Sequence, residues 1–563
     1  MLSPRAELVI EGRIATLAGD EGFGWAEALA IGEGRVLAAG RRSEVEALAG
    51  AATRWWRLGA ELMVMPGITD AHLHLLTMVV ADGQVDLSAT ADLEATLDAL
   101  AAADRERRER GDIDGWLLGH GWSLDRLGRW PDADVLGSAC PSRPVALYAH
   151  DHHSRWLSHA ALRLAGIDAL ADPSGGLIRR DTRGRATGIL HETAVALVDR
   201  AIPTPTDDEL AGALDRQAAG LAGLGVTGVH DPGELTQDRG IARGPVFYRR
   251  QAAAGRLPLR VHASIRSAQL DAAIELGLHS GDGIAPEVDE PPAQRLAARY
   301  TMGWLKLFAD GALGSRSAAL LEPYADRETR PPTGGERGMF LASADELAAD
   351  LGRAAQAGIS GQVHAIGDAA VRMVLDVLRG LPATRLMRRV EHAQLVDPAD
   401  QPRFGRLGIA ASVQPVHLRT DSAPARAAWG ERAGHAFPLA ALTAGGALIP
   451  FGTDAPVEPS DPWPGIAVSV ARRDPFDPSA PPLGAGHALD LARAIRAACL
   501  DPALVSGRSD LGRLLPGYLA DLLVVPSAGF TAGADPAVLA ATRPMATILD
   551  GEVIYRSSRF DAA

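Results

Sequence analysis

Eight short apolar runs recur along the middle of the chain, and amphipathic stretches separate most of the later ones. Runs of this length are typical of buried strands, and the stretches between them repeat apolar residues at helical spacing. The runs are LMVMPGIT (62–69), GVTGVHD (225–231), LPLRVHASI (257–265), WLKLFAD (304–310), GISGQVHA (358–365), LMRRVEHA (386–393), GIAASVQP (408–415) and ALIPFGTD (447–454). Strands alternating with helices predict an α/β fold, a (β/α)8 TIM barrel, with a doubly wound sheet as the alternative.

The stretch SADELAADLGRAAQAG (343–358) illustrates the helices that we expect between these strands. Ser343 and Glu346 have the spacing of a capping box, in which each side chain accepts a hydrogen bond from the backbone of the other. Gly358 follows the last helical position, where a left-handed residue commonly ends a helix. The sequence therefore predicts a helix between these residues.

The two chain ends share a different sequence pattern, in which glycine separates short apolar runs. Near the start these are residues 6–17 and 26–40, and near the end they are residues 515–527 and 546–557, with Asp550-Gly551 as a hairpin signal. Neither end has enough strands to be stable alone, so we expect both to pack together as a small β-sandwich. Two unrelated β appendages are the alternative.

These patterns define the expected domain organisation. About 155 residues separate the first predicted barrel strand from the second, and an insertion of this size usually builds a lid or substrate domain over a barrel. We expect residues 1–61 and 508–563 to contribute the N-terminal and C-terminal strands of the β-sandwich. The barrel is expected at 62–507, with the insertion at about 80–220.

Composition narrows the class of protein. The formal net charge of −14 argues against a nucleic-acid partner, which needs a basic surface. Two cysteines, Cys140 and Cys499, cannot form a disulfide framework, and neither a signal peptide nor an apolar run long enough for a membrane span is evident. We expect a cytoplasmic protein with a small-molecule substrate and no membrane partner, with a homodimer left open.

Lys306 is the only lysine in the chain, so the other 55 of its 56 basic residues are arginine. A guanidinium stays protonated, whereas a desolvated lysine amine can lose its proton and form a Schiff base or a carbamate with CO2. Chance survival of one lysine is the alternative to a chemical role.

Potential metal ligands stand near the ends of several predicted strands. The candidates are His72, His74, Lys306, His364, His392 and Asp454. The C-terminal ends of barrel strands ring one opening, so these side chains would converge, and alternation places His72 and His74 on one side of an extended chain. A core histidine is the alternative for His364 or His392 taken alone, but their joint placement favours a metal site.

A second H-x-H motif competes with the first. It lies in AHDHHSRW, where His150, His152 and His153 surround Asp151 within the predicted insertion. This motif lacks the strand that precedes His72, so we interpret it as a loop that faces the substrate or supports the site.

Six motifs together resemble the amidohydrolase superfamily, and more narrowly the YtcJ-like amidohydrolase family 3, whose relatives include N-substituted formamide deformylase. They are PGITDAHLH, LKLFADGALGSRSA, QVHAIGDAAV, RVEHAQLV, FGTDAPVEPSDPW and LPGYLADLLVV. The resemblance implies a metal-dependent hydrolase barrel with a β-sandwich formed by both termini. In the family pattern, one metal is held by His72, His74 and Asp454, a second by His364 and His392, and both are bridged by carboxylated Lys306. A carbamate supplies two anionic oxygens, which arginine cannot do, and the number of metals, one or two, stays open.

Residue chemistry supplies an expected mechanism. A divalent metal, with zinc expected from the N and O ligands, lowers the pKa of bound water from 15.7 to about 7. The resulting metal-bound hydroxide would attack the carbonyl of a non-peptide C–N bond in an amide, formamide or cyclic amide, with Asp454 as general base and then acid. A helix N-cap is the alternative role for Asp454.

Other reactions and other residues remain open at this point. A Schiff-base lyase or aldolase using Lys306, a metal-dependent esterase or lactonase, and a barrel that only binds a ligand are the alternatives. The substrate-binding candidates are Trp122, His153, Arg316 and Trp463. The tryptophans could instead pack a core, Arg316 could form a structural ion pair, and Asp368 is expected to orient a helix or His364. We assign no role to His417.

Overall fold

A computed structural model describes residues 5–149, 154–173, 176–233, 244–285, 291–328, 335–531 and 533–560. The chain divides into two compact units. The first comprises Met1–Met78, Leu214–Leu235 and Ile241–Ala563, and the second comprises Val79–Ala213 and Thr236–Gly240. Each unit is described by itself.

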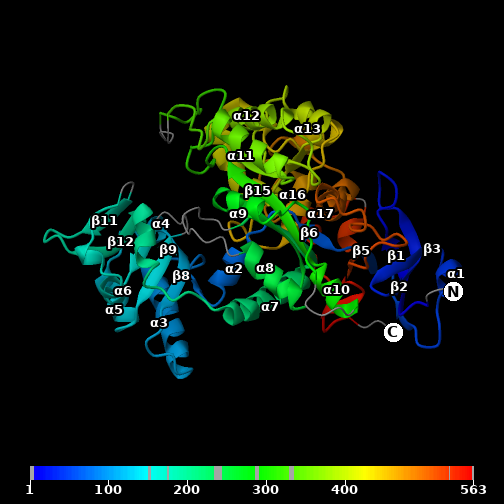
Figure 1. Cartoon of the computed structure of the whole chain (residues 1–563), viewed down its shortest axis with the longest axis horizontal. Coiled ribbons are helices and arrows are strands. Elements are labelled where there is room, and N and C mark those ends of the chain that lie inside the picture. Colours follow the sequence, from blue (N-terminus) through cyan, green and yellow to red (C-terminus); the bar gives the residue numbers. More distant parts are fainter. Residues whose placement is uncertain are drawn as a thin grey trace. The chain divides into compact units, whose positions relative to one another are not determined.

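A curled sheet of seven parallel strands forms the centre of the first unit (Figure 1). In spatial and sequence order its strands are β6 (Ile68–Asp70), β13 (Val226–Asp231), β14 (Arg260–Arg266), β15 (Tyr300–Phe308), β16 (Gly361–Ala365), β17 (Arg389–His392) and β18 (Ala410–Ser412). Every pair is parallel, which requires a crossover connection between successive strands. The α/β class expected from the sequence is confirmed.

The eighth expected strand, at 447–454, is an irregular segment that forms a single parallel bridge, between Val413 and Phe451. The amide of Val413 donates to the carbonyl of Pro450, and the amide of Ala71 donates to the carbonyl of Phe451. This segment therefore connects the β18 edge of the curled sheet to the chain that leaves β6.

Helices in the connections supply the other layer of this unit. They include α7 (Asp207–Leu224), α8 (Gly244–Ala253), α9 (Leu270–Glu275), α10 (Pro291–Ala297), α11 (Ala344–Gln356), α12 (Asp368–Arg379), α13 (Gln401–Leu407), α14 (Leu418–Trp429), α15 (Leu439–Ala444), α16 (Pro462–Ala471) and α17 (Leu491–Val505). Helix α11 has the predicted capping box between Ser343 and Glu346, and Gly358 has the expected left-handed conformation, with φ +72°.

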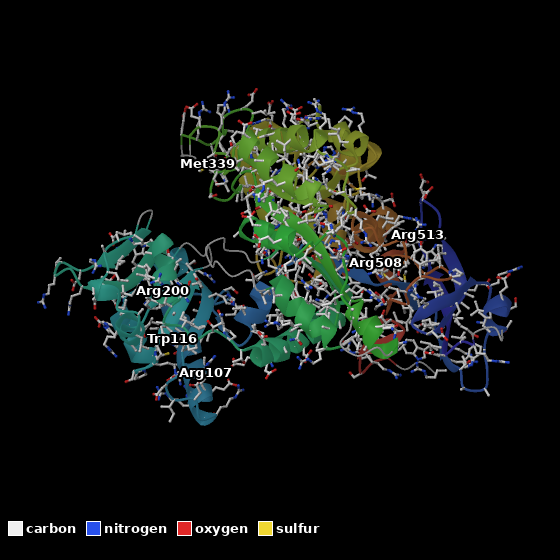
Figure 2. All side chains as sticks on the ribbon, in the orientation of Figure 1. Arg107, Trp116, Arg200, Met339, Arg508 and Arg513 are labelled. Atoms are coloured by element: carbon white, nitrogen blue, oxygen red, sulfur yellow. The ribbon has the colours of Figure 1, made fainter. Side chains whose placement is uncertain are left out.

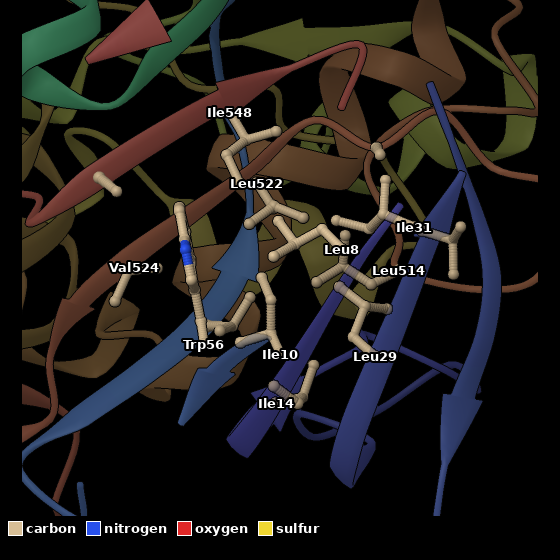
Figure 3. Close-up of a cluster of buried hydrophobic side chains, with 14 of the residues drawn as sticks. Leu8, Ile10, Ile14, Leu29, Ile31, Trp56, Leu514, Leu522, Val524 and Ile548 are labelled. Carbon is tan, nitrogen blue, oxygen red and sulfur yellow. The ribbon is translucent and has the colours of Figure 1, made fainter. Parts of the chain in front are cut away.

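Strands from both chain ends form one mixed sheet of eight strands, as expected from the similar sequence pattern of the two ends. They are β1 (Leu8–Ala15), β2 (Trp25–Gly32), β3 (Arg35–Gly40), β4 (Arg54–Arg57), β5 (Leu62–Pro66), β19 (Leu522–Pro526), β20 (Ala546–Leu549) and β21 (Glu552–Arg556). Leu8 and Trp56 pack in one buried cluster with Leu522 and Ile548 (Figure 3). The layering of this sheet as a sandwich stays a prediction.

The run 62–69, expected as one barrel strand, is two strands that belong to different sheets. Strand β5 pairs with β1 and β19 of the terminal sheet, whereas β6 pairs with β13 of the parallel sheet. Gly67 lies at the crossing, where an added Cβ would lie 2.4 Å from Oγ1 of Thr227. The close approach of the Thr227 side chain thus favours glycine at this position.

The second unit has its own six-stranded sheet, in the order β11-β12-β10-β9-β8-β7. The strands are β7 (Val85–Asp86), β8 (Leu117–Trp122), β9 (Val145–Ala149), β10 (Ser154–Leu157), β11 (Gly176–Arg180) and β12 (Ala186–Glu192), with α3 (Leu93–Glu109), α5 (Ala133–Ala139) and α6 (His159–Leu164) as its principal helices. Arg107 of α3 donates to the carbonyl of Trp116, which joins the helix to the start of β8 (Figure 2). Within the described ranges of both units, the helices are too short or too polar to cross a bilayer.

Candidate metal centre

Two histidines and one aspartate meet where β6 and the segment 447–454 end. His72 and His74 follow β6, and Asp454 ends the irregular segment, with its amide donating to the carbonyl of His72 at 2.7 Å. One oxygen of Asp454, Oδ1, lies 3.3 Å from Nε2 of His72 and 3.2 Å from Nε2 of His74. All three side chains are buried.

These separations fit a shared cation. Ligand bonds of 2.0–2.1 Å at tetrahedral angles place neighbouring donor atoms about 3.3–3.4 Å apart. His72, His74 and Asp454 therefore have the donor types and the spacing of a divalent metal site.

A second group of donors lies on the other side of the same carboxylate. His392, His417 and Asp454 also place donor atoms within 4.8 Å of one another. Nε2 of His417 lies 3.4 Å from Oδ2 of Asp454, the oxygen that does not face His72. Asp454 thus lies between two sets of imidazoles.

The backbone at this centre is unusual. His392 and Asp454 have φ values of +72° and +62°, in the left-handed region that non-glycine residues rarely adopt. In a regular strand, Glu391 and His392 would point to opposite faces. The turn at His392 lets both approach His72, because Glu391 contacts Nδ1 of His72 while the His392 and His72 rings lie 5.0 Å apart between centroids.

Three imidazoles are oriented through their Nδ1 atoms. Nδ1 of His72 contacts the carboxylate of Glu391, Nδ1 of His74 donates to the carbonyl of Gly233, and Nδ1 of His392 lies 2.8 Å from Oε1 of Gln414. Partners of this kind hold an imidazole in the tautomer whose Nε2 can bind a metal. Glu391 is itself held by an ion pair with Arg389.

Burial sets the protonation states. It lowers the pKa of His72 to about 4, and it holds the pKa of His392 well below the usual value. Burial alone would raise the pKa of Asp454, but His72, His417 and His74 outweigh it and hold that pKa well below the usual value. Near neutral pH His72 and His392 are therefore neutral and Asp454 is ionised, and these are the forms that bind metals.

Lys306 lies in the curled sheet on β15 and is 2% exposed. Among the residues that the structure describes, Nζ has no hydrogen-bond partner. Burial lowers the pKa of Lys306 to about 7, and Glu391 and Asp454 counteract only some of that decrease. A buried amine is expected to have a hydrogen-bond partner, so the position of Nζ fits an amine that is chemically modified or that contacts a bound group.

His364 lies beside His392, with 4.6 Å between ring centroids. Its Nε2 lies 3.1 Å from the carbonyl of Gly311, so its orientation is opposite to that of His72 and His392, and Nδ1 is the nitrogen left for other contacts. Burial lowers the pKa of His364 to about 3, with a smaller effect of Lys306.

Three of the four substrate-binding candidates have contacts with other groups of the protein. Trp122 is buried in the second unit and donates from Nε1 to the carbonyl of Leu147, and Trp463 is buried in the first unit and donates to the carbonyl of Leu224. Arg316 forms a two-pronged ion pair with Asp326, with a shortest distance of 2.7 Å. His153 lies outside the described residues, as do His150, Asp151 and His152. Asp368 begins α12 and accepts a hydrogen bond from the amide of Leu321.

Sequence reasoning missed the participation of Glu391 and His417. Glu391 immediately precedes a predicted ligand, and His417 shortly follows β18, so the rule that strand ends carry the site could have indicated both. Neither contact could be foreseen from alternation, because the left-handed residue at 392 and the 3₁₀ turn Pro415–His417 redirect the chain.

A curled parallel sheet with imidazole and carboxylate groups gathered at its strand ends defines an α/β unit with a candidate metal centre. Residues 60–555 match the model of the amidohydrolase family, so this chain belongs to that family, as its motifs predicted.

Individual proteins similar to this chain are consistent with that family. The chain is 30% identical over 503 residues to "Putative amidohydrolase YtcJ" of Bacillus subtilis (strain 168), covering 88% of this chain and 89% of the relative. It is 27% identical over 555 residues to N-substituted formamide deformylase of Arthrobacter pascens, covering 93% and 94%. A solved structure of an uncharacterized metal-dependent hydrolase from Pyrococcus horikoshii OT3 is similar with a TM-score of 0.74 at 25% identity, covering 97% and 99%.

Proposed function

We propose that this chain is a metal-dependent hydrolase that cleaves a non-peptide C–N bond in an amide, formamide or cyclic amide. The observation that carries the proposal is the position of the Asp454 carboxylate, which has three imidazole Nε2 atoms 3.2–3.4 Å away. Membership of the amidohydrolase family, a formamide deformylase relative and a metal-dependent hydrolase of similar structure support it.

His72, His74 and Asp454 would hold one divalent ion, and zinc is the metal we expect for this donor set. When bound, such an ion supplies Lewis acidity toward the substrate carbonyl and a water of lowered pKa. In the family pattern a second ion would lie between His364 and His392, which gives one or two ions per chain.

Asp454 would move the proton. Its carboxylate is ionised and its amide is tied to the carbonyl of His72, so it can accept a proton from the attacking water without a change of backbone position. It would then deliver that proton to the departing amine, which cannot leave as an anion.

Lys306 would carry a carbamate. A neutral amine adds CO2 and releases one proton, and a pKa of about 7 makes the neutral form available. Burial without a hydrogen-bond partner among the described residues supports a modified Lys306 in preference to a bare ammonium.

We also propose the finer fold that the sequence predicts. The hydrogen bonds of segment 447–454 to both Val413 and Ala71 support closure of the sheet into a (β/α)8 barrel. The buried cluster shared by both chain ends supports a β-sandwich at 1–61 and 508–563.

The test combines metal analysis with a substrate screen. Protein purified without chelator should contain one to two ions of transition metal, most of it zinc, and should hydrolyse members of a panel of N-formyl amines, N-acyl amines, cyclic amides and esters. His72→Ala should lose metal and most turnover, whereas His279→Ala, which changes a half-exposed histidine paired with Asp282, should lose neither. His152→Ala changes the second H-x-H motif and should retain the metal.

Undiminished hydrolysis by metal-free protein would contradict the proposal.

The lowered pKa of Lys306 also favours a second candidate, a Schiff-base lyase. In that case Lys306 would attack a carbonyl substrate and lose water to form an imine. Borohydride treatment with carbonyl substrates distinguishes the two, because reduction would leave a covalent adduct at Lys306 only in a lyase.

A further inference from the structure

We propose that His417, His392 and Oδ2 of Asp454 form a second cation position, beside the one formed by His72, His74 and Oδ1. This inference rests on the proposed metal-dependent function, and it replaces His364 of the family pattern by His417 as a ligand of the second ion.

The two oxygens of the Asp454 carboxylate face different imidazoles. Oδ1 lies 3.3 and 3.2 Å from the Nε2 atoms of His72 and His74, whereas Oδ2 lies 3.4 Å from Nε2 of His417. All three separations lie within about 0.1 Å of the 3.3–3.4 Å expected between neighbouring ligands of one tetrahedral ion. One carboxylate therefore faces two positions and could bridge two ions.

His417 is a buried residue with a ring nitrogen left unsatisfied by the residues that the structure describes. The side chain is 7% exposed, and its Nε2 has no hydrogen-bond partner within the described part of the chain. A buried ring nitrogen in that state is costly unless something binds it. The nearest charged group is Oδ2 of Asp454, at 3.4 Å.

The imidazoles of His417 and His392 both turn Nδ1 toward an oxygen of a neighbouring side chain. Nδ1 of His417 faces Oε1 of Glu458 at 3.8 Å, and Glu458 is fixed by a hydrogen bond of 2.8 Å from Thr420. His392 is likewise held through Nδ1 by Gln414, which directs its Nε2 elsewhere. His392 thus shares the arrangement of His72 and His74, in which Nδ1 is engaged and Nε2 is available, whereas Nδ1 of His417 only faces a carboxylate. His364 has the reverse arrangement, with Nε2 engaged by Gly311.

Metal stoichiometry tests the assignment without reliance on turnover. Metal-free full-length protein, in buffer with bicarbonate so that Lys306 can be carboxylated, is titrated with Zn²⁺ by calorimetry and with Co²⁺ by visible absorption. Wild type should bind two ions. His417→Gln keeps an amide that can donate a hydrogen bond to Asp454 but is a poor metal ligand, so this variant should bind one ion with unchanged affinity and the other at least roughly 100-fold more weakly.

Two further variants give the assignment its controls. Glu458→Gln should weaken only the second ion, by up to roughly 10-fold, because it removes the negative charge that faces Nδ1 of His417. His364→Ala should still bind two ions. Circular dichroism and thermal unfolding should be unchanged in His417→Gln, which shows that any loss is not misfolding.

The outcomes separate this inference from the proposed function. Two ions of unchanged affinity in His417→Gln, or loss of the second ion in His364→Ala alone, would overturn the role of His417. One ion in wild type that depends on His72 but not on His417 would overturn it too, and would leave the metal-dependent proposal intact. A wild type that binds no ion would overturn both.

Discussion

At the scale of single residues, the candidate site depends on chemistry that other side chains cannot replace. His72, His74 and Asp454 were predicted from strand ends, and the structure places Nε2 of both histidines 3.2–3.3 Å from Oδ1 of Asp454. The supporting contacts of Glu391 and His417 could not be predicted, since they depend on a left-handed residue at 392 and on residues far apart in sequence. Ligand types follow from the sequence, whereas the groups that orient them follow from the folded backbone.

Lys306 gives a prediction at this scale. If it carries a bridging carbamate, Lys306→Ala leaves a vacancy that acetate, formate or bicarbonate can enter, so these anions should partly restore hydrolysis. Lys306→Arg should remain inactive with all three, because a guanidinium would place a cation beside bound cations. Hydrolysis is measured against anion concentration for both variants. A bare ammonium at Lys306 in an active, metal-loaded structure would contradict the prediction, as would equal rescue of both variants.

At the scale of elements, local signals predicted helices well and strand ends poorly. The spacing of Ser343 and Glu346 fixed the start of α11, because a capping box is a local interaction. The run 62–69 was predicted as one strand, yet it divides at Gly67 between two sheets. Apolar runs do not reveal which sheet a strand joins, because either sheet buries the same side chains.

The N-cap of α11 gives a prediction about one element. Ser343 is exposed, and its hydroxyl accepts a hydrogen bond from the amide of Glu346 at 3.3 Å. Ser343→Ala should destabilise the first turn by about 1 kcal/mol, which corresponds to about fivefold faster hydrogen exchange there. Exchange of peptides from residues 343–349 measures this, with Ser343→Asn as the control that retains a cap. Equal exchange in wild type and Ser343→Ala would show that tertiary packing alone fixes the helix start.

At the scale of the whole molecule, a buried charge network joins the parallel sheet to the terminal sheet within the first unit. Arg260 of β14 binds Asp521, with Nε 2.6 Å from Oδ2, and also binds Asp550. Arg299 binds Asp550 from the other side at 2.9 Å. The hairpin at Asp550-Gly551 was predicted, and both residues have positive φ as a two-residue turn requires. The network was not predicted, because its two arginines lie more than 200 residues from the two aspartates in the sequence.

This network gives the last prediction. Burial alone would raise the pKa of Asp550, but Arg260 and Arg299 outweigh it and hold the pKa below its usual value. A lowered carboxyl pKa contributes stability at pH values above the unfolded pKa of about 3.9, and that contribution is lost as the pH falls through the folded pKa. Asp550→Asn keeps the preference for this turn but removes the charge, so at pH 7 it should lower the free energy of unfolding by up to about 3–5 kcal/mol.

The pH dependence identifies the cause of that loss. Urea unfolding followed by tryptophan fluorescence should show a large difference between wild type and Asp550→Asn at pH 7. The difference should shrink steadily below about pH 4, because the carboxyl of the unfolded wild-type chain binds a proton there whereas the folded carboxylate does so only at lower pH. Asp271→Asn is the matched control, since it removes an exposed partner of Arg353 and should cost less than about 1 kcal/mol at either pH. A difference for Asp550→Asn that stayed constant down to pH 3 would assign the loss to packing and would remove the charge network as the link between the two sheets.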